Sequence, residues 1–168
     1  MTTETQIEPQ PSPVAELSDE ELTAIVESEA YKAWVGENGA DVVARQDGVP
    51  LIFYHGGHSG VTEFNRDNPR HTGQGQHGIY FSERLNPARF FADTLRAEQH
   101  EQSDSGQSSV YAVILKMRNP LAVEVGSGIE SGSIDAVPQG YDGLVNPRKH
   151  EVVVFDPAQI FIAKEMTR

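Results

Sequence analysis

The stretch that decides the fold is Pro50-Leu-Ile-Phe-Tyr-His-Gly-Gly57. Its run of apolar and aromatic residues, entered through Gly48 and Pro50, predicts a buried β-strand bounded by turn residues. The strand ends on His55, and the two glycines after it allow another molecule to approach the backbone closely. A polar ring beside accessible peptide groups suits the binding of a flat ligand. The same residues also fit a core strand that enters a glycine turn, with a histidine that is only hydrogen-bonded.

The composition indicates one soluble globular domain. The chain has 168 residues, of which 38% are hydrophobic, and this length is enough to bury a real core. No apolar run approaches the length of a membrane span, and the first residues, MTTETQIEPQPSP, lack the basic and apolar regions of a secretory signal. Without cysteine the chain has neither a disulfide nor a thiolate nucleophile. These features fit a cytoplasmic protein.

The net charge of −12 is concentrated near the N-terminus. Residues 1–50 hold eleven of the 25 acidic residues against Lys32 and Arg45, a balance of −9, which leaves −3 for the rest of the chain. A general nucleic-acid-binding surface is not expected, because duplex affinity depends on Lys and Arg that neutralise phosphates. An acidic segment can engage a basic partner, although a solvated face explains it equally simply.

Residues 1–16 are rich in Pro, Gln, Thr and Glu and predict a disordered acidic leader, followed by a single domain over residues 17–168. Ser18 and Glu21 form a capping-box pattern that starts a helix, Gly36 ends it, and Trp34 is expected to anchor it to the core. A second helix is expected from Asn86 and Pro87, fading into a polar loop over 98–106.

Further strands are predicted at 78–82, 110–117, 121–125, 140–145, 151–155 and 160–163, with a surface loop over 126–138. Because these strands do not strictly alternate with helices, the pattern predicts the α+β class. The segment Gly73-Gln-Gly-Gln-His-Gly78 matches a dinucleotide fingerprint, but it precedes a strand instead of opening a helix. We therefore do not predict a Rossmann fold.

Three polar residues lie on or beside apolar strands: His55, Tyr80 and Glu151. Each has a structural explanation, since a strand tyrosine usually packs against its neighbours and a glutamate at a strand start is usually solvated. Their conjunction is more informative. Glu151 begins Glu-Val-Val-Val-Phe155, and a carboxylate that enters a buried strand is costly unless it has a role.

Five segments resemble a known family: Tyr31-Lys-Ala-Trp-Val-Gly36, Gly48-Val-Pro-Leu-Ile-Phe-Tyr-His-Gly-Gly57, Gly78-Ile-Tyr-Phe-Ser82, Gly140-Tyr-Asp-Gly143 and Glu151-Val-Val-Val-Phe-Asp-Pro157. In this order, over about residues 30–162, they resemble the ADP-ribosyltransferase domains of phage and mobile-element polyvalent proteins. Those domains are similar to the diphtheria-toxin and poly(ADP-ribose) polymerase branch, which a His, Tyr, Glu triad marks. Gly57 departs from the commoner His-Gly-Thr. The resemblance implies split antiparallel sheets with flanking helices.

The resemblance also implies a role for each matching residue, with NAD+ as co-substrate and no metal. His55 would bind the adenosine ribose, and the backbone of Gly56 would bind the nicotinamide carboxamide. Tyr80 would stack on the nicotinamide ring, with Phe90 or Phe91 on its other side and Ser82 at the pocket border. Glu151 would bind the 2′-hydroxyl of the nicotinamide ribose and act as the catalytic carboxylate, with His55 and Tyr80 completing the triad.

The implied activity is mono-ADP-ribosyl transfer to a host macromolecule, more readily a protein than a nucleic acid, in the cytoplasm of a bacterial host. A phage or mobile-element effector without a membrane partner is the expected setting. The sequence leaves other activities open. They are NAD+ hydrolysis, RNA 2′-phosphotransfer, which would use basic residues such as Arg66, Arg70, Arg84 and Arg89, and a non-catalytic inhibitor on the same fold, which the acidic leader favours.

Two rival chemistries find weaker support in the sequence. His55 and His58, together with His71 and His77, could form a metal cluster, but no H-E-x-x-H pattern accompanies them. A serine hydrolase is not predicted, because the chain has no G-x-S-x-G elbow.

Overall fold

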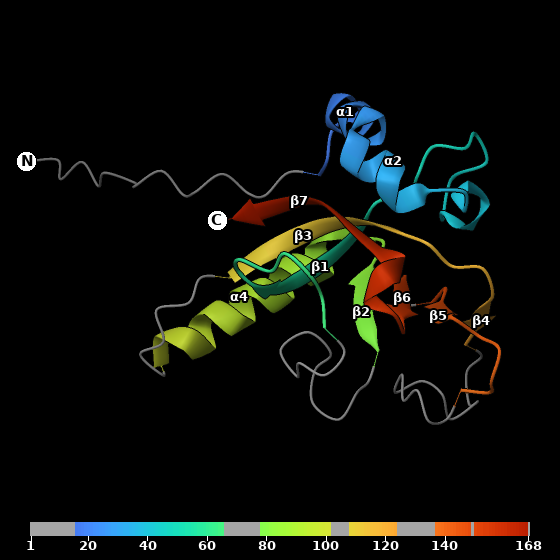
Figure 1. Ribbon diagram of the computed structural model, residues 1–168. Coiled ribbons are helices and arrows are strands. Elements are labelled where there is room, and N and C mark those ends of the chain that lie inside the picture. The colour runs from blue at the N-terminus through green and yellow to red at the C-terminus, as the bar shows by residue number, and fades with distance from the viewer. Residues whose placement is uncertain (1–15, 66–77, 102–107, 124–136, 149, 168) are drawn as a thin grey trace, which may run out of the picture.

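The computed structural model describes residues 16–65, 78–101, 108–123, 137–148 and 150–167, and these residues fold around one seven-stranded sheet (Figure 1). The strand order is β4-β5-β6-β2-β1-β3-β7, and every pairing is antiparallel except that of β4 with β5. The strands are β1 Phe53–His58, β2 Ile79–Ser82, β3 Ser108–Leu115, β4 Pro120–Ala122, β5 Gly143–Asn146, β6 Glu151–Val154 and β7 Ile160–Thr167. The α+β class is confirmed, and the stretch around His55 forms a central strand.

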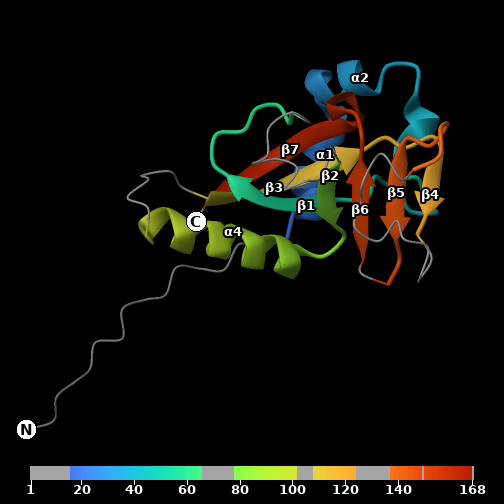
Figure 2. The same cartoon turned by 90° about the horizontal axis from the view of Figure 1, so that it is seen from below.

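The sheet consists of two halves that meet at a single residue pair. β4, β5, β6 and β2 form one half and β1, β3 and β7 the other, and the pairing between β1 and β2 is Tyr54 with Ser82. Figure 2 shows β4, β5 and β6 running across the direction of β1, β3 and β7. The main core lies between the halves, and its members include Phe53, Tyr111, Val113 and Leu115 from one half and Ile79, Phe81, Val152 and Val154 from the other. This arrangement is a split sheet.

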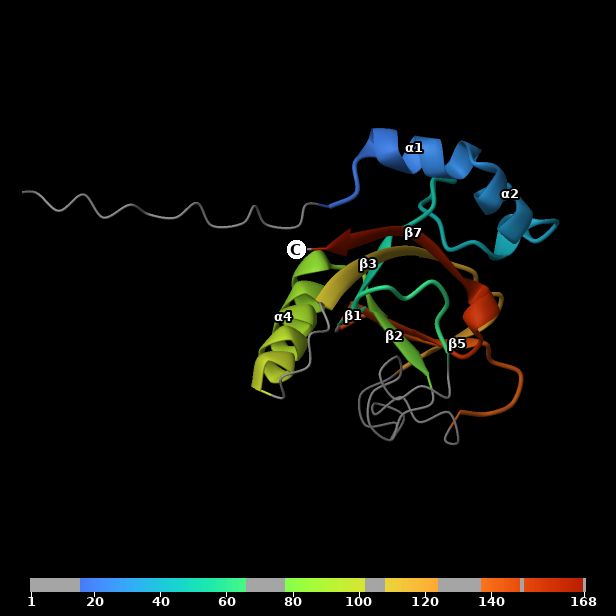
Figure 3. The same ribbon diagram turned by 60° about the vertical axis from the view of Figure 1, so that its left-hand side comes forward.

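Helices cover the other face of the β1–β3–β7 half (Figure 3). Helix α4, Leu85–Glu101, packs Ala88 and Ala92 against a second cluster that includes Val110 and Ala112. Helices α1, Asp19–Glu27, and α2, Glu29–Val35, lie over β7. The expected anchoring of Trp34 is confirmed. Its ring centroid is 5.5 Å from that of Phe161, and its indole N–H donates to the carbonyl of Ala158.

The structure corrects several boundaries. The single helix expected between residues 18 and 36 is two helices, because Ser28 is extended and its hydroxyl caps α2 by accepting from the N–H of Tyr31. The predicted polar loop over 98–106 begins later, since α4 continues to Glu101. β7 is longer than expected, because its pairing with β3 extends to Thr167. The predicted leader except its last residue, most of the 126–138 loop and the glycine motif before Gly78 lie outside the described residues.

The segment Gly140-Tyr-Asp-Gly143 forms the corner between β3, β4 and β5. The Asp142 carboxylate accepts from the N–H groups of Arg118 and Asn119, at 2.6 and 2.9 Å. A Cβ on Gly143 would lie 2.9 Å from the carbonyl oxygen of Val153, so only glycine fits there without rearrangement. Among the described residues, no helix has both the length and the apolar character needed to cross a membrane.

Candidate functional site

β1 directs His55 and Gly56 to opposite sides of the sheet, because successive residues of a strand alternate. The His55 ring lies on the side of the main core, with centroids 5.0 Å from Phe64 and 5.5 Å from Phe81. Gly56 faces α4 on the other side, since a Cβ there would lie 2.0 Å from the carbonyl oxygen of Ala88. Because α4 closes that side, a ligand that contacts both residues would meet Gly56 through its backbone groups, which lie in the plane of the sheet.

The tautomer of His55 follows from its hydrogen bond. Its Nδ1 lies 2.7 Å from the carbonyl oxygen of Tyr80, and a carbonyl can only accept. Nδ1 therefore carries the proton, which leaves Nε2 of the neutral ring as an acceptor. A ribose hydroxyl is a suitable donor for that nitrogen. The ring is almost completely buried, at 8% exposure, so this orientation is held firmly.

Gly57 leaves the space beside the His55 ring open. It lies two residues after His55 on the same side of β1, and a Cβ at Gly57 would lie 3.2 Å from Nε2 and 3.3 Å from Cδ2. The family that the sequence resembles more often has threonine at this position. A threonine would crowd this edge of the imidazole. The glycine therefore leaves this edge of the ring uncrowded by residue 57.

Tyr80, Ser82 and Glu151 share one face of the other half-sheet. Tyr80 pairs with Val153 and Ser82 with Glu151, so Tyr80 and Glu151 are diagonal neighbours on adjacent strands. Burial, together with the negative charge of Glu151, raises the pKa of Tyr80 to about 12. The phenol is therefore protonated at neutral pH and can donate a hydrogen bond.

Helix α4 begins directly beside these residues but does not bury its two phenylalanines. Phe90 is 73% exposed and Phe91 is 54% exposed, whereas Ala88 and Ala92 pack inward against β1. The structure thus brings Tyr80, Ser82 and Glu151 together on one face, joins His55 to Tyr80 through the backbone, and leaves Phe90 and Phe91 at the surface. The stacking role expected for a phenylalanine stays a prediction.

A polar network fixes the segment that follows β1, and sequence reasoning missed it. The hydroxyl of Tyr111 donates to the carbonyl of His58 and accepts from the N–H of Val61 at 3.0 Å. The Glu165 carboxylate accepts from the N–H of Gly60 and from the hydroxyl of Ser109, each at 2.9 Å. The segment then places Phe64, which is 2% exposed, edge-on against His55. Only the tertiary structure reveals this contact, because its partners lie far apart in the sequence.

Sequence reasoning also missed a contact between two strand ends, where Glu83 and Arg84 follow β2 and His150 precedes β6. It named Arg84 only as a basic residue of an alternative activity. Arg84 Nη2 lies 2.8 Å from His150 Nε2, and Glu83 Oε2 lies 3.3 Å from His150 Nδ1. The available signal was local, since His150 immediately precedes Glu151.

Metal binding has little support from the described residues. His55 and His58 lie on opposite sides of β1, and His71 and His77 lie outside the described part of the chain. Within that part, no group of three or more His, Asp or Glu side chains is placed to hold a metal ion.

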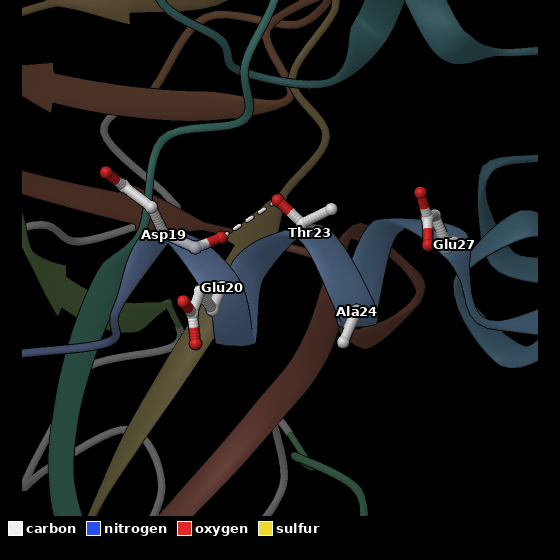
Figure 4. Close-up of a pocket in the computed structure, with 5 residues that line it drawn as sticks. All are labelled: Asp19, Glu20, Thr23, Ala24 and Glu27. Carbon is white, nitrogen blue, oxygen red and sulfur yellow. Dashed lines mark hydrogen bonds between the residues drawn. The ribbon is translucent and has the colours of Figure 1, made fainter.

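One hollow on the surface lies along α1, away from these residues in the chain. Asp19, Glu20, Thr23, Ala24 and Glu27 line it along α1, where the hydroxyl of Thr23 donates to the carbonyl of Asp19 (Figure 4). It is open, acidic and far along the chain from Tyr80 and Glu151, so we assign it no part in the site.

Comparison with known protein families identifies one match. Residues 45–167 match the family described as ADP-Ribosyltransferase in polyvalent proteins. This range includes all the site residues named above and excludes α1, α2 and the acidic hollow. No curated protein matches the chain.

Proposed function

The chain belongs to the ADP-ribosyltransferase family of polyvalent proteins, and from this we propose that it cleaves NAD+ at the nicotinamide–ribose bond and transfers ADP-ribose to a protein of a bacterial host. The family uses NAD+ as co-substrate. We assign the catalytic carboxylate to Glu151 and the binding of NAD+ to His55, Gly56, Tyr80 and Ser82.

The proposal depends above all on the proximity of Tyr80 and Glu151 beside the junction of the half-sheets. An aromatic ring and a carboxylate on one face can contact a nicotinamide ring and its ribose together. His55 on β1 would bind the distant ribose. A dinucleotide bound along the junction would be held at both ends.

The chemistry requires a fixed negative charge at this place. When the bond between the ribose carbon and the nicotinamide nitrogen breaks, its electron pair leaves with nicotinamide, which departs as a neutral molecule. Positive charge develops on the sugar, and the Glu151 carboxylate, bound to the 2′-hydroxyl, would stabilise it more in the transition state than in the ground state. The acceptor nucleophile then bonds to the sugar carbon and releases its proton to solvent.

The charge distribution supports a protein acceptor over a nucleic acid. Beyond residue 50 the chain carries fourteen acidic and eleven basic residues, a balance of −3. A nucleic-acid acceptor would favour an excess of Lys and Arg around the site. The host setting and a role as a phage or mobile-element effector rest on the family alone.

Incubation with NAD+ labelled in the adenosine part tests the proposal. We expect the label to enter host proteins when a bacterial lysate is treated with the wild-type chain. Glu151→Gln should slow this labelling by about 10²–10³-fold, as for the loss of one preorganised electrostatic group, while NAD+ still binds. Glu63→Gln is the matched control, because Glu63 is exposed and outside the assigned site.

The same experiment separates the two alternatives. Release of free ADP-ribose without labelled protein would indicate an NAD+ hydrolase, with water as the acceptor. Binding without any cleavage would indicate a non-catalytic module. Unchanged turnover in Glu151→Gln would remove Glu151 from the mechanism.

A further inference from the structure

His150 adopts an unusual backbone conformation immediately before Glu151. Its φ is 51°, and among the described residues it is the one non-glycine residue with a positive φ. Residues other than glycine enter this left-handed region at a cost in free energy, and such strain persists where the surrounding structure enforces it. The conformation therefore needs a cause near the start of β6.

Backbone pairing on both sides of His150 supplies part of that cause. The N–H of Glu83 donates to the carbonyl of His150 at 2.8 Å, one residue beyond the Ser82–Glu151 pair. On the other strand, Asn146 pairs with Glu151. The backbone of Glu151 is thus fixed between β2 and β5, and the chain must turn sharply at His150 to enter it.

The imidazole of His150 is held between a cation and an anion. Arg84 Nη2 lies 2.8 Å from Nε2, and Glu83 Oε2 lies 3.3 Å from Nδ1. A guanidinium group only donates, so Nε2 must accept and Nδ1 must carry the proton that is donated to Glu83. The N–H of Arg84 in turn donates to the hydroxyl of Ser82 at 3.0 Å. We call the three residues Glu83, Arg84 and His150 the clamp.

We propose that the clamp positions the Glu151 carboxylate, with His150 as its central positioning residue. The inference rests on the function proposed above. Glu83 and Arg84 follow β2, which carries Tyr80, and His150 precedes β6, which carries Glu151. The clamp therefore joins the ends of the two strands that carry the candidate site. In this way it would hold the distance between the Tyr80 ring and the Glu151 carboxylate.

Three variants separate positioning from a purely structural role. His150→Gly removes the imidazole and also relieves the left-handed backbone, so it should not lower the free energy of unfolding. Arg84→Gln removes the donor to Nε2. Arg148→Gln is the matched control, because Arg148 is an exposed arginine of the same loop that is not part of the clamp.

Steady-state cleavage of NAD+ is the first readout. We expect kcat to fall about tenfold or more in His150→Gly and Arg84→Gln, since small displacements of a catalytic group are costly, with KM within about twofold of wild type. Unchanged kcat in both clamp variants would overturn the proposal.

The second readout does not need activity, so it separates this inference from the proposed function. Fluorine NMR of the chain labelled with 3-fluorotyrosine reports the titration of each tyrosine. The signal of residue 80 is identified as the one that is missing from Tyr80→Phe. If the clamp positions Glu151, His150→Gly should lower the pKa of this phenol in the same direction as Glu151→Gln does, and Arg148→Gln should not change it. If the wild-type protein does not cleave NAD+ but His150→Gly still lowers the pKa of the Tyr80 phenol, the clamp is supported and the proposed function is rejected. If His150→Gly leaves this pKa unchanged, the clamp is rejected.

Discussion

The imidazole of His55 is hydrogen-bonded to the backbone of Tyr80, with 2.7 Å between Nδ1 and the carbonyl oxygen. This bond crosses from β1 to β2 next to Tyr54 and Ser82, the one pair that links these strands in the described residues. It connects His55, which we assign to the adenosine ribose, to β2, which carries the Tyr80 ring assigned to nicotinamide. The junction of the half-sheets is therefore stabilised by a residue of the candidate site itself.

We expect His55→Asn to weaken NAD+ binding while the fold is kept. The asparagine amide can still donate to the carbonyl of Tyr80, but it has no counterpart of Nε2. The loss of one neutral hydrogen bond is worth about 0.5–1.5 kcal/mol, which corresponds to about a twofold to tenfold higher Kd. Calorimetric titration with NAD+ measures it. An unchanged Kd would mean that Nε2 makes no contact with the ligand.

Gly56→Ala should destabilise the protein strongly. The new Cβ would lie 2.0 Å from the carbonyl oxygen of Ala88 and 2.9 Å from the nitrogen of Ala92, so α4 must move away from β1. We expect a loss of about 3 kcal/mol in the free energy of unfolding, the upper end for overpacking. Urea denaturation measures it. Gly39→Ala is the control, because its Cβ would meet only Val35 Cγ1, at 3.6 Å.

Gly57→Ala should weaken NAD+ binding more than it lowers the stability of the fold. Its Cβ would lie 3.2 Å from Nε2 of the His55 ring, so the ring must shift by a few tenths of an ångström. That shift displaces Nε2, and we expect Kd for NAD+ to rise while the urea midpoint stays close to that of wild type. Equal losses of stability in Gly56→Ala and Gly57→Ala would contradict this distinction.

The fold could largely be predicted because its signals are local. Apolar strands, glycine turns and a capping box each act over a few residues, and they indicated the α+β class and a strand that ends at His55. The break at Ser28 was also local, but the continuous apolar stripe of the helix concealed it. Contacts such as Glu165 with Gly60 and Arg84 with His150 join residues 105 and 66 positions apart, so no short pattern carries them.

Alkaline pH should destabilise the wild-type chain. Burial is the main cause that raises the pKa of Tyr80 and of Tyr111 to about 12. Both phenols hold their proton more tightly in the folded chain, so this contribution is complete below about pH 10, where unfolded tyrosine titrates, and is lost as the pH rises towards 12. Urea denaturation between pH 8 and pH 11 should show a shallower decline in Tyr80→Phe. A decline equally steep in both proteins would contradict the raised pKa.

Tyr111→Phe should cost stability and loosen the segment that holds Phe64 against His55. The substitution keeps the buried ring but leaves the carbonyl of His58 and the N–H of Val61 without the hydroxyl that each contacts. Because these groups are only partly buried, we expect a loss of about 1 kcal/mol in the free energy of unfolding, which urea denaturation measures. Tyr31→Phe is the matched control, because Tyr31 is also buried and its hydroxyl forms no hydrogen bond with the described residues. If the network also orients His55, Tyr111→Phe should raise Kd for NAD+ and Tyr31→Phe should not; equal affinities would limit the network to a structural role.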